Sequence, residues 1–145
     1  MLASVWLALP VLLAADPSQP PAEGVLSRLD LTSFPNSTGP ARLRGPATPA
    51  EAGFSEAWSG EGGWAYRSSP RDGPGGYWEL GLRVLETHGD GVSVCFTDVA
   101  HNGGSYFVQT ALILTPTADG YAARKGPERA DCPEWRRRSD AAPRP

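Results

Sequence analysis

The two cysteines, Cys95 and Cys132, give the most specific chemical prediction, because their positions favour a disulfide. Cys95 lies on the polar face of an alternating segment, residues 92–98, and Cys132 lies beyond the last predicted strand. In an oxidising compartment we expect a Cys95–Cys132 disulfide that pins the C-terminal tail across a sheet. A bridge that closes a loop of about 38 residues contributes roughly 4 kcal/mol in the chain-entropy model. Two unpaired cysteines are the alternative.

The two histidines set limits on metal binding and catalysis. His88 and His101 flank residues 92–98 at opposite ends, about 23 Å apart at the rise of a strand, so we expect no shared metal ion. Asp98 and His101 as acid–base partners, with Asn102 as an orienting group, are the enzymatic hypothesis. All three residue types are also common in turns. We favour that interpretation and predict no catalytic residue, no metal and no cofactor.

A dense set of aromatic residues is the strongest candidate for binding. The candidate ligand-binding residues are aromatic or lie in the turn that follows residues 92–98: Trp58, Trp64, Tyr66, Tyr77, His101 and Asn102. Such side chains can form a surface for a sugar or an apolar ligand. The same rings can instead fill a core that is poor in aliphatic residues. Trp78 favours the core interpretation, because it alternates with Leu80 and Leu82.

These residues need a β scaffold to position them. The 145 residues include 17 Gly and 15 Pro, so long helices are not expected. Alternating or apolar segments bounded by Gly-rich turns predict strands at residues 54–59, 64–69, 77–87, 92–98, 106–115 and 121–125. The predicted fold is mainly β, a small antiparallel meander of about six strands that forms a barrel or a curled sheet. This β domain is expected to span residues 53–125.

The two ends of the chain are expected to have other roles. Residues 2–15 carry no charge, and as a helix they would span about 21 Å, too short for a membrane anchor, so residues 1–15 are predicted to be a signal peptide. A buried first element of the domain is the alternative. Residues 16–52 are expected to be a linker and an irregular Pro-rich segment, within which residues 25–34 could form a strand or a short helix. Residues 126–145 are expected to be a polar tail pinned through Cys132.

These features predict a periplasmic or secreted protein. The net charge of −3 indicates no nucleic-acid partner, and no stable membrane insertion is expected after cleavage of the leader. The leading hypothesis is a non-catalytic binding or interaction module whose partner is an unknown small ligand or an envelope protein. A small hydrolase-type enzyme that uses Asp98 and His101, or a structural envelope subunit, are the alternatives.

Overall fold

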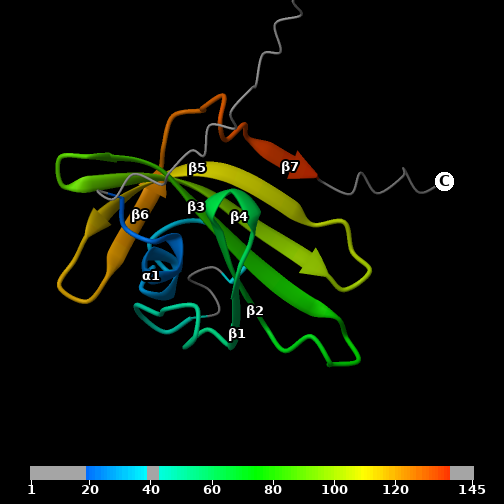
Figure 1. The fold of residues 1–145 in the computed structure, drawn as a ribbon. Coiled ribbons are helices and arrows are strands. Elements are labelled where there is room, and N and C mark those ends of the chain that lie inside the picture. The colour runs from blue at the N-terminus through cyan, green and yellow to red at the C-terminus, as the bar shows by residue number, and fades with distance from the viewer. Residues whose placement is uncertain (1–18, 39–42, 138–145) are drawn as a thin grey trace, which may run out of the picture.

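The chain folds as one curled antiparallel sheet with a short helix against it (Figure 1). The computed structural model describes residues 19–38 and 43–137. Its strands are β1 (Glu56–Ser59), β2 (Trp64–Ser68), β3 (Tyr77–His88), β4 (Gly91–His101), β5 (Phe107–Pro116), β6 (Tyr121–Lys125) and β7 (Trp135–Arg137). Strands β1 to β6 pair in chain order, and β7 pairs with β5 beyond the end of β6. Because β1 and β6 do not pair, the sheet is curled and not a closed barrel.

The predicted mainly β meander is therefore confirmed, with two differences in its elements. β4 continues to His101, three residues past its expected end, so Asp98 lies within a strand. β7 was not expected, because its three residues show no strand pattern of their own and it forms only by pairing with β5. Residues 25–34, which the sequence left open, belong in part to α1 (Ala22–Ser27). The leader prediction for residues 1–15 lies outside the described residues.

The core lies between one face of the sheet and the segment around α1. This inner face carries the residues expected from alternation, among them Leu80, Leu82, Val94 and Phe96. The N-terminal segment covers it with side chains that are at most 3 % exposed: Val25, Leu26, Leu29, Leu31 and Phe34. Each such side chain contributes roughly 1.5–3 kcal/mol when buried. Part of the region set apart as a linker is thus integral to the folded domain.

Backbone pairing holds this N-terminal segment in place. Leu29 forms a parallel bridge with Tyr121 of β6, and the amide of Asp30 donates to the Tyr121 carbonyl at 2.8 Å. The segment thereby covers the outer edge of β6, which would otherwise present unpaired backbone groups.

Among the described residues, no helix is long and apolar enough to cross a membrane.

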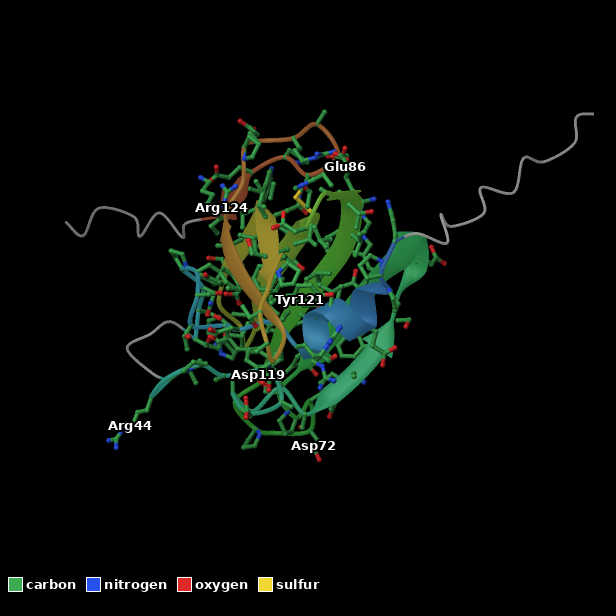
Figure 2. All side chains as sticks on the ribbon, turned by 90° about the vertical axis from the view of Figure 1, so that its left-hand side faces the viewer. Arg44, Asp72, Glu86, Asp119, Tyr121 and Arg124 are labelled. Atoms are coloured by element: carbon green, nitrogen blue, oxygen red, sulfur yellow. A yellow bond between two sulfur atoms is a disulfide. The ribbon has the colours of Figure 1, made fainter. Side chains whose placement is uncertain are left out.

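The opposite, outer face of the sheet carries the predicted disulfide. Cys95 and Cys132 are bonded, with Cα atoms 5.5 Å apart, and both are buried. Figure 2 shows the sulfur–sulfur bond in yellow, at the end of the sheet where Glu86 is labelled and far from Asp72. The bond ties the strap, residues 126–137, across β4 and β5. Its polar-face position on β4 is the reason that Cys95 is accessible to this returning segment.

Candidate functional site

The predicted binding aromatics share the outer face, and Trp78 does not. Directly paired residues point to the same side of a sheet, and the pairs Trp58–Tyr66, Tyr66–Gly81 and Gly81–Thr97 lead to the face that carries Cys95. Trp78 packs against the inner core instead. The core interpretation therefore applies to Trp78, while the other rings form a second layer that is partly exposed.

Three of these rings form an aromatic ladder, defined as Trp58, Tyr66 and Trp64. The Tyr66 ring is nearly parallel to both indoles, with centroids 5.5 Å from Trp58 and 5.9 Å from Trp64. Guanidinium groups complete the layer, since Arg71 lies 4.7 Å from the centroid of Trp58 and Arg83 lies 5.5 Å from that of Trp64. The ring faces are thus largely used by neighbours within the protein, and the ladder is a rigid platform with little ring area free for a sugar.

Gly81 is what allows Tyr66 to lie against the sheet. A Cβ atom at this position would stand 2.9 Å from Cε1 of Tyr66 and would overlap the hydroxyl of Thr97. Because Gly81 has no side chain, the outer face of β3 has a space at this one position, and the ring of Tyr66 fills it.

Beyond the ladder, Tyr77 and His101 meet at the other end of the same face. They are directly paired on β3 and β4, and their rings are stacked with centroids 4.4 Å apart. The carboxylate nearest to His101 is that of Glu79, with Oε2 3.5 Å from Nε2. Glu79 is 17 % exposed and His101 37 % exposed in their side chains, so this pair is accessible from solvent.

The structure does not bring Asp98 and His101 together. They are three residues apart on one strand, so Asp98 faces the inner side and His101 the outer side. Asp98 is 1 % exposed, and its carboxylate accepts hydrogen bonds from the backbone amide and the hydroxyl of Ser37, both at 2.6 Å. The hydroxyl of Tyr106 lies 3.5 Å from the same carboxylate. Asp98 thus anchors the N-terminal segment from within the core.

Burial dominates the electrostatics of Asp98. It raises the pKa of the carboxyl above its ordinary value of 3.8, and the hydrogen bonds from Ser37 and Tyr106 oppose that rise only in part.

Asn102, the third member of the enzymatic hypothesis, closes the turn after β4, because its Oδ1 accepts from the amide of Gly104 at 3.0 Å. Within the described residues, no group of three or more His, Cys, Asp or Glu side chains is placed to hold a metal ion.

A groove next to Tyr77 and His101 is the site that we consider the strongest candidate. It lies where the β4–β5 turn meets β7, at the right-hand end of the sheet in Figure 1, and has a volume of about 580 Å³. Its walls are mostly apolar and bear no charged side chain: Val99, Ala100, Gly104, Ser105, Tyr106, Phe107, Gln109, Pro133 and Trp135. We call this site the Trp135 groove.

Trp135 itself is held in position although it is exposed. Its indole packs edge-to-face on Phe107, with centroids 5.8 Å apart, and its backbone pairs with Gln109. The side chain of Gln109 donates to the carbonyl of Pro133 at 3.0 Å and fixes the strap that leads to the indole. Trp135 is 52 % exposed, and in the described part of the chain it stands out as the exposed large hydrophobic residue.

Two other cavities are weaker candidates. One, of about 470 Å³, lies near Asp119 and Tyr121, which Figure 2 labels, and is also lined by Asp30 and Glu51. Asp30 accepts hydrogen bonds from Thr32 and Ala47, and Glu51 accepts from Thr48, so these two carboxylates already have partners. The third cavity, of about 270 Å³, is lined in part by Thr38 and Leu43, and the residues between these two are not described.

The sequence did not single out Glu79, Val99, Phe107 or Trp135 as site residues. Glu79 reads as the polar position of an alternating strand, and its proximity to His101 depends on the pairing of β3 with β4. Val99 lies one residue past the predicted strand 92–98, and Phe107 is the second residue of the predicted strand 106–115. Trp135 carried a usable signal, since a large aromatic residue in a polar tail is unusual.

Comparison of the chain with protein-family models, with curated proteins and with solved structures finds no match.

Proposed function

We propose that this protein is an exported, non-catalytic binding module that accepts the apolar group of a small ligand in the Trp135 groove. The observation that carries the proposal is the groove itself, about 580 Å³ of mostly apolar lining around an indole that is 52 % exposed. Sites for small ligands are typically concave, mostly apolar and about 300–1,000 Å³ in volume. The packing of Trp135 on Phe107 and the hydrogen bond from Gln109 to Pro133 hold two walls of the groove in place without a ligand.

Support for a non-catalytic role comes from the separation of the groups that could do chemistry. Asp98 is enclosed with Ser37 on the inner face, and His101 lies beside Glu79 on the outer face. A general acid or base acts only on an atom within its own hydrogen-bond reach, and two groups on opposite faces of a sheet do not reach the same substrate. A binding function needs only the groove and the polar groups around it.

Support for export comes from the disulfide and the leader-like N-terminus. The Cys95–Cys132 bond is compatible with an oxidising compartment, and residues 2–15 are uncharged and apolar apart from Ser4 and Pro10. The test is the intact mass of the protein recovered from its native compartment, with and without reductant and alkylating agent. We expect a mass that lacks about 15 residues and two cysteines that react only after reduction. A full-length mass with two free thiols would contradict export.

Binding is tested with a neutral apolar probe. We expect 1-naphthylmethanol to shift the amide resonances of Val99, Phe107 and Gln109 in a heteronuclear NMR titration. Trp135→Ala should weaken this binding several-fold because it removes one wall of the groove. Trp58→Ala is the matched control, since it truncates an indole on the same face but on β1, at the opposite edge of the sheet from the Trp135 groove. No saturable shift in the wild type, or equal loss in both variants, would contradict the proposal.

A second candidate role, an envelope subunit that pairs with another chain, is favoured by one observation. β1 pairs only with β2, so one edge of this four-residue strand has no partner among the described strands. An exposed edge can add a strand from another protein. Sedimentation across a range of concentrations tests this role for self-association, and a constant monomeric mass would count against it.

A further inference from the structure

We propose that the ligand of the Trp135 groove is a small molecule that carries a positively charged group, an ammonium or a guanidinium, and that Glu79 binds that group. This inference rests on the proposed function and specifies the class of ligand.

The position of Glu79 places a negative charge at the edge of the groove. Glu79 is directly paired with Val99, and Val99 is directly paired with Phe107, so the three residues form one row across β3, β4 and β5. Directly paired side chains on one face lie about 5 Å apart at Cβ. Val99 and Phe107 line the groove. A ligand that fills the groove therefore reaches the Glu79 carboxylate with an extension of only a few atoms.

The Glu79 carboxylate has few partners among the described residues. It is 17 % exposed and lies 3.5 Å from Nε2 of His101, and it accepts no hydrogen bond from any residue that the structure describes. By contrast, Glu56 accepts a hydrogen bond from Arg71 at 2.6 Å and Glu86 accepts one from Arg129 at 3.1 Å. A partly exposed carboxylate without a donor from the protein can accept a charge-assisted hydrogen bond from a bound ligand.

Aromatic rings around Glu79 favour a cation over a neutral donor. Tyr77 and His101 are stacked beside it, and the charge of Glu79 adds to the effect of burial in raising the pKa of Tyr66. Ring faces and a carboxylate together attract ammonium and guanidinium groups. The same outer face already holds cations against rings, since Arg71 and Arg83 lie over Trp58 and Trp64.

Among the side chains that the structure describes, which do not include those of Arg136 and Arg137, no arginine or lysine forms an ion pair with Glu79. Arg83 lies on the same face of β3, but its Nη2 donates to the carbonyl of Asp131 in the strap at 2.6 Å, away from Glu79. His101 is the one neighbour that forms an ion pair with Glu79 when protonated, and it does so at 3.5 Å. The site therefore combines an apolar groove, flanking rings and an available carboxylate, in a volume suited to a small molecule rather than a protein surface.

The test compares two probes that share one apolar body, 1-naphthylmethanol and 1-naphthylmethylamine, the second of which is protonated at neutral pH. We expect the amine to bind the wild-type chain about tenfold more tightly, a modest value for a hydrogen bond to a partly exposed charge. Glu79→Gln should remove this preference and leave the affinity for the alcohol unchanged. Glu86→Gln, an exposed glutamate on the same strand, is the control that should change neither affinity.

The outcomes separate this inference from the proposed function. Equal affinity for the two probes, or a preference that survives in Glu79→Gln, overturns the cation assignment while the groove remains a binding site. Failure of both probes to bind contradicts the proposed function itself. Binding of a lysine-containing peptide without any binding of the free amine overturns the assignment to a small molecule.

Discussion

Loss of the disulfide should destabilise the fold and also open the groove. The perturbation is the double variant Cys95→Ala, Cys132→Ala. The bond joins residues 37 apart in sequence, and both residues are buried, at 1 % and 0 % exposed. Restricting the unfolded chain with a loop of this length contributes about 4 kcal/mol. For a domain of roughly 115 residues, that loss corresponds to a drop in Tm of roughly 15 °C.

Urea denaturation measures this loss and identifies its origin. Because the bond acts mainly on the unfolded chain, the variant should expose more surface on unfolding and show a larger m-value as well as a lower midpoint. Wild-type protein unfolded in the presence of reductant is the control and should approach the variant. A loss under about 1 kcal/mol with an unchanged m-value would refute the chain-entropy reasoning.

The same variant gives a functional readout at a temperature where it remains folded. The strap that Cys132 ties down carries Pro133 and Trp135, two walls of the groove. We therefore expect the affinity for 1-naphthylmethanol to fall together with the stability. Unchanged affinity in a folded variant would show that β7 holds the groove without the covalent bond.

Three further predictions follow from buried positions. Asp98→Asn should remove a pH dependence of stability. Burial raises the pKa of the Asp98 carboxyl in the folded state above 3.8, so the folded state binds the proton more tightly than the unfolded state. The stability of the wild type relative to the variant should therefore fall as pH rises from 3.8 through the raised pKa, which urea unfolding between pH 3 and 7 measures. Gly81→Ala should cost about 1–3 kcal/mol by crowding Tyr66, whereas Gly75→Ala, with open space around it, should be near neutral in thermal unfolding. Leu31→Ala should cost about 2–5 kcal/mol in the same assay, and a cost near zero would contradict a core role for the N-terminal segment.

The expected strands and their faces follow from local pattern. A residue's side on a strand is set by its position alone, because successive side chains alternate. Residues 77–87 and 92–98 show this alternation clearly, and the structure places Leu82 and Phe96 in the core and Cys95 on the outer face. The disulfide was predictable for the same reason, since only two cysteines are present and one of them faces away from the core.

The extent of β4 was harder to predict, and it separates Asp98 from His101, the two residues on which the enzymatic hypothesis depends. The strand was expected to end at Asp98 and the Gly-rich turn to span residues 101–104, so His101 was assigned to the turn. Pairing with β3 extends β4 to His101, and pairing with β5 continues to Val99. Once the strand includes both residues, their spacing of three puts them on opposite faces.

The sequence by itself thus determined strands β1 to β6 apart from the end of β4, the sides on which their residues lie and the disulfide, because each of these depends on short-range pattern or on residue count. Only the tertiary structure decided which residues from different strands become neighbours. Glu79 lies beside His101 and Val99 because of the register between β3 and β4, and Trp135 reaches Phe107 because Cys132 ties the strap over β5. Register and strap position depend on contacts between residues far apart in the chain, and a pattern confined to one strand carries no information about them.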